Sequence, residues 1–195
     1  MLVTPHTKDN MNWVQTFSGR KVDLEYPKPE DIAIEDIAHA LSRICRYGGH
    51  CKDFYSVAEH SLLVEKVIQD EICDCKPVNM AGLLHDAAEA YLGDMISPLK
   101  KIVTRELYLE GRWLDAISEK FALEVKLNPM NRRVHTADAF MMKVEVYSVL
   151  PSVHSDWGFP LKRPEFPSYY QPKCLPPAEA EKAFLARFRE LVTVL

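Results

Sequence analysis

Four residues of the types that bind metal ions dominate the chemistry that this sequence offers. His60 lies at helical spacing from apolar residues on both sides, so its imidazole shares the apolar face of a helix. Asp138 interrupts the apolar stripe of a later helix in the same way, and burial without a partner is strongly unfavourable for a carboxylate. Together with the adjacent pair His85 and Asp86, they supply two imidazoles and two carboxylates, a donor set suited to one divalent cation. A lone histidine on an apolar face is more often a satisfied core residue, so that alternative stays open for His60.

A polar stripe in the segment after Pro77 contains His85, Asp86 and Glu89 on the face opposite the apolar one. The simplest interpretation is a solvated helix face. However, residues 77–99 contain no Lys or Arg, whereas Asp86, Glu89 and Asp94 are all acidic. This imbalance predicts that something cationic lies against the stripe.

The elements that must position these residues are predicted to be mostly helical. A small hairpin is expected over residues 11–26, and helical periodicity begins at residue 31. Helices are expected over about 34–47, 54–70, 77–91, 97–126, 129–150 and 178–194. Residues 151–177 hold seven of the 13 prolines and predict an irregular stretch, either functional or a cover over something. The fold class is therefore all-α, a single domain over residues 1–195 with about six helices, a core over about 31–150 and a small N-terminal β-hairpin.

Composition narrows the class of protein. The 195 residues are 47% hydrophobic and 27% charged, which is typical of one globular domain. A net charge of −4 argues against coating of nucleic acid, and no apolar run is long enough to cross a membrane. Five cysteines without framework spacing, and no signal sequence before them, predict reduced thiols in a cytoplasmic protein. Cys73 and Cys75 would form half of a zinc site at most.

Three segments, SVAEHSLLV, LLHDAAEAYLGDMISPLK and TADAF, resemble the signature segments of the HD-domain metal-dependent phosphohydrolases. The resemblance covers about residues 46–147, and it is similar in shape to small bacterial 5′-deoxynucleotidases and phage dATP triphosphohydrolases. It implies an enzyme of a bacterial or phage-infected cytoplasm. The long approach before residue 46 and the aromatic, Pro-rich residues 151–177 depart from that pattern.

Carried over to this sequence, the resemblance implies the roles of individual residues. It makes a divalent ion (Zn, Co, Mn or Mg) the cofactor, with four ligands: His60, His85, Asp86 and Asp138. Glu89 and Asp94 fall where the family places its acid/base and water-positioning carboxylates. A divalent ion lowers the pKa of bound water and polarises a phosphoryl oxygen, which agrees with hydrolysis of a phosphate ester. The alternative for Glu89 is an exposed helix glutamate.

A phosphate substrate also needs positive charge from the protein. Lys100 is expected in the first turn of a helix capped by Ser97, where backbone N–H groups and the ammonium would converge on one anion. Arg46 and Tyr47 fall where the resembling enzymes keep an arginine that reaches the nucleotide and an aromatic residue that stacks on the base. The alternatives are a surface arginine and a core tyrosine.

The substrate expected from these residues is a deoxynucleotide. A purine dNTP is favoured over a monophosphate, because further basic residues lie near the motifs: Arg43, Lys100, Lys101 and Arg105. The resemblance to the phage enzymes puts dATP first, cleaved to deoxyadenosine and triphosphate. A 5′-deoxynucleotidase acting on dNMPs is the first alternative. A non-catalytic, metal-containing nucleotide sensor is the second, although such a protein would need neither Glu89 nor Asp94.

Self-association into a dimer or a hexamer is also expected. The resembling phosphohydrolases usually form dimers or larger rings, and this sequence has spare apolar material: Met80, Met95, Met141, Met142 and the aromatic residues of 151–177. The alternative is that these side chains fill the core.

Overall fold

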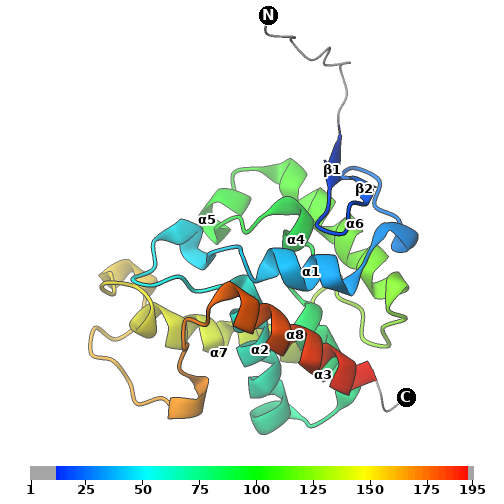
Figure 1. Cartoon of the computed structure of the whole chain (residues 1–195). Helices are drawn as coiled ribbons and strands as arrows, with labels where there is room; N and C mark the ends of the chain where they lie inside the picture. The colour runs from blue at the N-terminus through cyan, green and yellow to red at the C-terminus, as the bar shows by residue number, and fades with distance from the viewer. Residues whose placement is uncertain (1–11, 193–195) are drawn as a thin grey trace, which may run out of the picture.

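The computed structural model describes residues 12–192, apart from the side chains of residues 104–108. The described part is mostly helical. In chain order the α-helices are α1 (Ile34–Leu41), α2 (Val57–Val67), α3 (Lys76–Leu84), α4 (Glu89–Leu92), α5 (Ser97–Lys100), α6 (Thr104–Lys120), α7 (Arg132–Ser148) and α8 (Pro177–Val192) (Figure 1). Six of those in the described part have eight residues or more, so the predicted all-α class with about six helices is confirmed. None of the described helices is long and apolar enough to cross a membrane.

The N-terminal hairpin is also confirmed. Its strands, β1 (Trp13–Gln15) and β2 (Lys21–Asp23), pair antiparallel. Gly19 turns the chain between them with a φ of +83°, a conformation that glycine adopts without strain. The indole N–H of Trp113 on α6 donates to the carbonyl of Leu24 at 3.1 Å, which ties the segment after the hairpin to the bundle.

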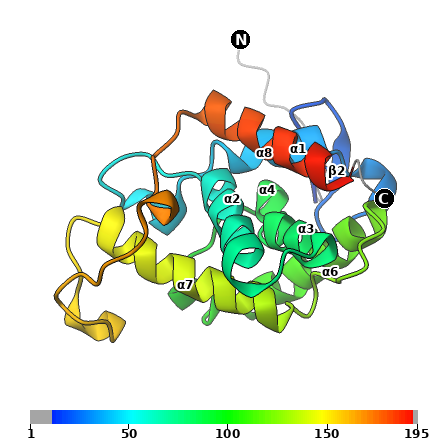
Figure 2. The same ribbon diagram turned by 90° about the horizontal axis from the view of Figure 1, so that it is seen from below.

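The helices lie in three layers (Figure 2). Helices α1 and α8 form one outer layer, α2, α3 and α4 the middle one, and α6 and α7 the other outer layer. Helix α2 contacts α3, α7 and α8, so it is covered from several sides. Val57, Ala58, Leu83 and Leu84 of the middle layer are fully buried. Several polar side chains of α2 and α3 are therefore buried between helices, among them Glu59, His60 and Asn79.

The prediction of one continuous helix over residues 77–91 is wrong, because the helix is interrupted. Helix α3 ends at Leu84, and residues 85–88 form turns in which N–H groups bond to the carbonyl three positions back, before α4 begins at Glu89. The chain then leaves α4 at Gly93, whose φ is +84°. The periodicity stays close to helical across the break, which is why the sequence pattern does not reveal it.

Two other expected helices are shorter than predicted. Helix α1 ends at Leu41, and a 3-10 turn over Arg46–Gly49 follows it, with Tyr47 at a φ of +56°. The helix expected over 97–126 is divided into the four-residue α5 and the longer α6. Ser97 is the first residue of α5 rather than its cap, and no side chain caps that helix.

The Pro-rich stretch contains only short 3-10 turns, over Ser155–Trp157 and Ser168–Tyr170, before α8 begins at Pro177. Tyr170 is buried in the core, whereas Trp157 and Tyr169 are exposed, so the aromatic residues of this stretch have no single role. The carboxylate of Glu59 on α2 accepts the backbone N–H groups of Lys173 and Leu175, which fixes the end of the stretch against the middle layer.

The structure differs from expectation for two cysteines and two methionines. Cys73 and Cys75 form a disulfide across a Cα–Cα distance of 5.3 Å, so the prediction of reduced thiols is wrong for this pair. Met80 and Met141 belong to the core and are not available for a contact with another chain.

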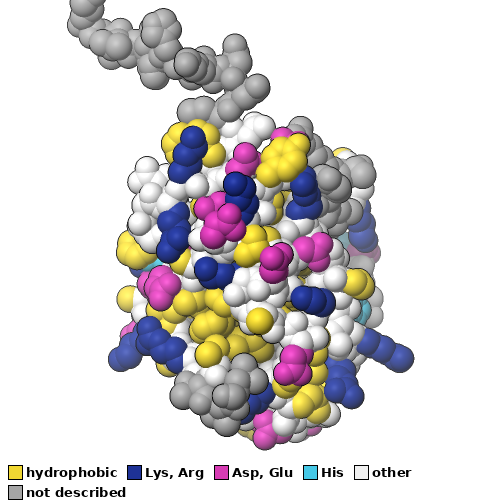
Figure 3. All heavy atoms as spheres, turned by 90° about the vertical axis from the view of Figure 1, so that its right-hand side faces the viewer, with side chains coloured by type: hydrophobic (Ala, Val, Ile, Leu, Met, Phe, Trp, Pro, Cys, Tyr) yellow, Lys and Arg dark blue, Asp and Glu magenta, His cyan; other side chains and the backbone are white. Residues whose placement is uncertain are grey.

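Figure 3 shows hydrophobic side chains gathered on the face that carries the end of α8. A hollow of about 360 Å³ lies there, lined mainly by the start of α3, the end of α6 and α8.

Candidate metal centre

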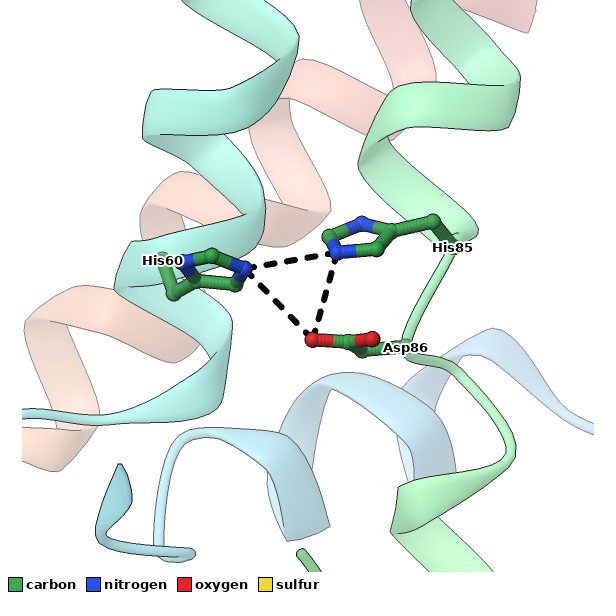
Figure 4. A group of neighbouring side chains, drawn as sticks. All are labelled: His60, His85 and Asp86. Atoms are coloured by element: carbon green, nitrogen blue, oxygen red, sulfur yellow. Dashed lines mark hydrogen bonds and ion pairs between the residues drawn. The ribbon is translucent and has the colours of Figure 1, made fainter. Parts of the chain in front are cut away.

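The side chains of His60, His85 and Asp86 point toward one another from α2 and from the turn after α3 (Figure 4). The two Nε2 atoms are 3.3 Å apart. Oδ2 of Asp86 lies 3.2 Å from Nε2 of His85 and 3.5 Å from Nε2 of His60. Both histidines are almost fully buried, so the solvated helix face considered for His85 is excluded. The interruption after Leu84 allows two consecutive residues to face the same point.

Asp138 of α7 completes the group. Its Oδ1 atom lies 3.3 Å from Nε2 of His60 and 4.0 Å from Nε2 of His85. The structure therefore brings together all four predicted ligands, which come from three segments that are far apart in the chain. The side chain of Asp138 is 32% exposed, so the group opens toward solvent on this side.

The hydrogen bonds of the two imidazoles orient their free nitrogens. Nδ1 of His60 lies 2.5 Å from Oε1 of Glu145, and Nδ1 of His85 lies 2.8 Å from the carbonyl oxygen of Gly82. Because both acceptors require a proton on Nδ1, the lone pairs of both Nε2 atoms are directed into the group. This is the usual arrangement around histidines that bind metals. The donor set, two imidazole nitrogens and two carboxylate oxygens, fits a divalent transition-metal ion.

Electrostatics support the same conclusion. Burial raises the pKa of Asp86, but the neighbouring His85 and His60 lower it by more than burial raises it. The pKa of Asp86 therefore lies well below its ordinary value. Burial also raises the pKa of Asp138, but its interaction with the nearby ring of His60 outweighs burial and lowers the pKa below its ordinary value. For His60, burial and Arg46 lower the pKa, whereas Glu145 and Asp138 raise it to about 9. Both aspartates are thus held as anions, and the site as described attracts positive charge.

Glu89 has the surroundings of a proton-transfer group. It is 4% exposed, which excludes the exposed helix glutamate considered as an alternative. Its Oε1 atom accepts from Lys100 at 3.3 Å, whereas its buried Oε2 atom finds no hydrogen-bond partner among the described residues. Burial, followed by the charges of Asp86 and Asp94, raises the pKa of Glu89, and Lys100 lowers it only in part. The pKa of Asp94 is also raised, chiefly by burial.

Lys100 does not lie at a helix N-terminus that could hold an anion. Helix α5 is only four residues long, and Lys100 is its last residue rather than part of a capped first turn. Its ammonium donates to Glu89 and to Glu110 of α6, at 3.3 and 3.0 Å. The predicted combination of backbone N–H groups and ammonium is therefore wrong, and Lys100 lies beside the site through its contact with Glu89.

Arg46 and Tyr47 lie beside the candidate metal site. Arg46 donates from Nη1 to Asp86 at 3.4 Å and from Nη2 to Glu145 at 3.3 Å. Its buried Nε atom has no hydrogen-bond partner among the described residues. The hydroxyl of Tyr47 donates to Glu145 at 2.8 Å, and its ring meets the ring of Trp157 edge-on with centroids 6.5 Å apart. Neither residue is the surface arginine or core tyrosine of the alternatives.

The other basic residues are less closely connected with the site. Arg43 donates to Glu181 of α8 at 2.7 Å, and Lys101 is exposed. The side chain of Arg105 lies outside the described residues. Within the described part of the chain, the positive charge in contact with the cluster and with Glu89 thus comes from Arg46 and Lys100.

Glu145 is the main residue that the sequence analysis missed. It is fully buried and has four side-chain donors: Arg46, Tyr47, Tyr55 and His60. Its spacing from Asp138 is seven residues, two helical turns, so it interrupts the same apolar stripe. The signal that identified Asp138, a carboxylate on an inward face, could have identified Glu145 too. No sequence signal links Trp157 or Glu110 to the site.

Comparison with known proteins identifies the family of this chain. Residues 49–123 match the HD domain family. An uncharacterized protein of Rhodobacter capsulatus is 36% identical over 190 residues, which is 94% of this chain and 97% of that protein. The uncharacterized protein YfdR of Escherichia coli is 36% identical over 135 residues, 69% of this chain and 71% of that protein. The helical fold and the buried His–His–Asp group define an HD-domain protein with a candidate metal site. The chain belongs to the HD-domain family.

Proposed function

We propose that the protein is a metal-dependent phosphohydrolase that cleaves the 5′ phosphoester of a deoxynucleotide, with dATP hydrolysed to deoxyadenosine and triphosphate. The observation that carries this proposal is the group of four candidate ligands beside Glu89, a buried carboxylate whose Oε2 atom has no hydrogen-bond partner among the described residues. A metal held only for structure would not require a buried acid such as Glu89 next to it. The contact of Arg46 with Asp86 places a cation beside the same group.

The residues present can perform each part of this reaction. A divalent ion held by the four ligands would polarise the phosphoryl group and activate water. Arg46 would donate from Nε to a phosphate oxygen. Glu89 would carry a proton on Oε2, and its raised pKa favours the protonated form that a general acid needs. In the overall reaction, water adds to the phosphorus that carries the 5′ oxygen, and the bond between that phosphorus and the 5′ oxygen breaks. The 5′ oxygen takes a proton, so deoxyadenosine and triphosphate are released.

Chromatography of the products tests the reaction. Purified protein supplied with Mn²⁺, Co²⁺, Zn²⁺ or Mg²⁺ is incubated with each dNTP and each dNMP. Intact triphosphate and deoxyadenosine are expected from dATP. Release of no nucleoside from any nucleotide, with any of the four metals, would contradict the proposal.

Hydrolysis of dNMPs is the second candidate, and one observation favours it. A triphosphate carries more negative charge than a monophosphate, yet Arg43 is engaged by Glu181 and Lys100 by two glutamates. The same chromatography separates the candidates, because activity on dAMP without activity on dATP would assign a 5′-deoxynucleotidase. Binding of dATP without turnover would instead assign a nucleotide sensor.

A further inference from the structure

The two carboxylate oxygens of Glu145 serve two different halves of the site. Oε1 accepts from Nδ1 of His60 at 2.5 Å and from the hydroxyl of Tyr55 at 2.8 Å. Oε2 accepts from the hydroxyl of Tyr47 at 2.8 Å and from Nη2 of Arg46 at 3.3 Å. One oxygen thus contacts a predicted metal ligand, and the other contacts the two residues expected to bind the nucleotide.

This carboxylate is held as an anion in the interior. It is fully buried, and the guanidinium of Arg46 and the ring of His60 both lie against it. An ionised carboxylate accepts about four hydrogen bonds, and four donors are present, so its bonding capacity is filled. Removing one partner of such a network leaves other buried groups unsatisfied.

Arg46 links Glu145 to Asp86. Its guanidinium lies between Glu145 and Asp86, with one nitrogen on each carboxylate. If Glu145 lost its charge, Asp86 would be the remaining anion in contact with Arg46. The Oδ2 atom that Arg46 contacts is the same atom that faces both histidines, so a stronger bond to Arg46 would compete with a metal ion.

We propose that Glu145 is a positioning residue that couples the metal cluster to the substrate-binding arginine. Through Oε1 it fixes the proton of His60 on Nδ1, and through Oε2 it keeps Arg46 from closing on Asp86. Metal and phosphate therefore bind with mutually increased affinity, because the same carboxylate arranges both sites, and such coupling is reciprocal. This inference rests on the proposed function for the identity of the ligands.

Titration calorimetry with Mn²⁺ alone tests the metal half. Glu145→Gln keeps the shape of the side chain, and in EDTA-treated protein it is expected to weaken Mn²⁺ binding by about 10- to 100-fold, the usual effect of losing such a partner. Glu65→Gln is the matched control, because Glu65 is also a buried carboxylate of the bundle and pairs with Arg187 on α8. It removes the same charge and is expected to leave Mn²⁺ affinity unchanged.

Inorganic phosphate tests the coupling. In the wild-type protein, phosphate is expected to bind more tightly with Mn²⁺ present, and Glu145→Gln is expected to abolish this difference. Two milder variants separate the halves: Tyr55→Phe acts on the Oε1 side and should weaken Mn²⁺ more than phosphate. Tyr47→Phe acts on the Oε2 side and should do the reverse. These variants keep the test valid even if Glu145→Gln does not fold.

Three results would overturn the inference. They are wild-type Mn²⁺ affinity in Glu145→Gln, an equal loss in Glu65→Gln, and absence of Mn²⁺ binding by the wild-type protein. Failure of the proposed function is a separate result, because Mn²⁺ and phosphate binding require no turnover. A protein that binds both but hydrolyses no nucleotide would retain the coupling and lose the phosphohydrolase assignment.

Discussion

The Nε2 atoms of His60 and His85 lie 3.3 Å apart, although one histidine is on α2 and the other follows α3. Each ring donates its Nδ1 proton elsewhere, so two neutral imidazoles would face each other with lone pairs only. Such a pair is stable when it shares a cation, either a proton or a metal ion. Burial and Arg46 lower the pKa of His60, but Glu145 and Asp138 outweigh them and raise it to about 9.

Replacement of Asp138 tests whether the fourth ligand is required. Asp138→Ala is expected to lose both bound metal and activity while the chain remains folded, because the partly exposed carboxylate leaves no new buried polar group. Metal content after dialysis, activity and circular dichroism are measured together. Asp156→Ala, at a side chain that is 87% exposed, should change none of them. Unfolding of Asp138→Ala would show that the residue is structural.

Glu89→Ala should separate metal binding from turnover. Removal of a general acid or base usually lowers the rate by about 10²- to 10⁴-fold, and we expect that loss with bound metal retained. Glu110→Ala is the control, since it removes the other carboxylate in contact with Lys100 without touching the proposed acid. Equal loss of metal in Glu89→Ala and Asp138→Ala would show that Glu89 coordinates the ion.

Gly82 determines how closely α2 and α3 approach. A Cβ atom at this position would lie 2.4 Å from Cδ1 of Ile68 and 3.4 Å from Cα of Glu65. Gly82→Ala is therefore expected to lower the free energy of unfolding by about 1–3 kcal/mol in urea, and to weaken metal binding by moving His85. Gly111→Ala, which meets only the flexible side chain of Asn128, should be neutral or stabilising. Equal destabilisation by both would contradict this account.

Trp157 is expected to contribute to substrate binding. Its ring is 38% exposed and lies beside Tyr47, whose hydroxyl is fixed by Glu145. If the base stacks there, Trp157→Ala should raise KM for the nucleotide about 10-fold, given typical stacking energies of about 1–3 kcal/mol, and change kcat little. Tyr169→Ala, at another exposed aromatic residue of the same Pro-rich stretch, should leave KM unchanged. An unchanged KM in Trp157→Ala would remove this residue from the binding site.

Self-association remains a prediction, and the structure indicates where to test it. The segment around α5 exposes four apolar side chains: Ile96, Leu99, Ile102 and Val103. We expect light scattering to give a mass that is an even multiple of 22.4 kDa, and Ile102→Asp to lower it. Ile102 is 78% exposed, so this change should not affect the fold of one chain. A wild-type mass of one chain would contradict the prediction.

The sequence determined the helical class and the four residues that meet in the candidate metal site. Helical periodicity depends on local spacing, and His60 and Asp138 are visible because a polar residue on an apolar stripe needs a partner wherever the helix packs. The same reasoning failed at the ends of helices. The turn after Leu84 and the separation of α5 from α6 depend on packing between distant segments, which periodicity does not encode.

Only the tertiary structure decided which charged groups meet. Lys100 pairs with Glu110, Arg43 with Glu181, and Arg46 with two carboxylates, and each choice depends on how separate helices are packed. Glu145 is the clearest case, because its role comes from donors that lie 85 to 99 residues earlier in the chain. A sequence shows that a carboxylate points inward, but the partner that stabilises its charge is fixed by packing across the bundle.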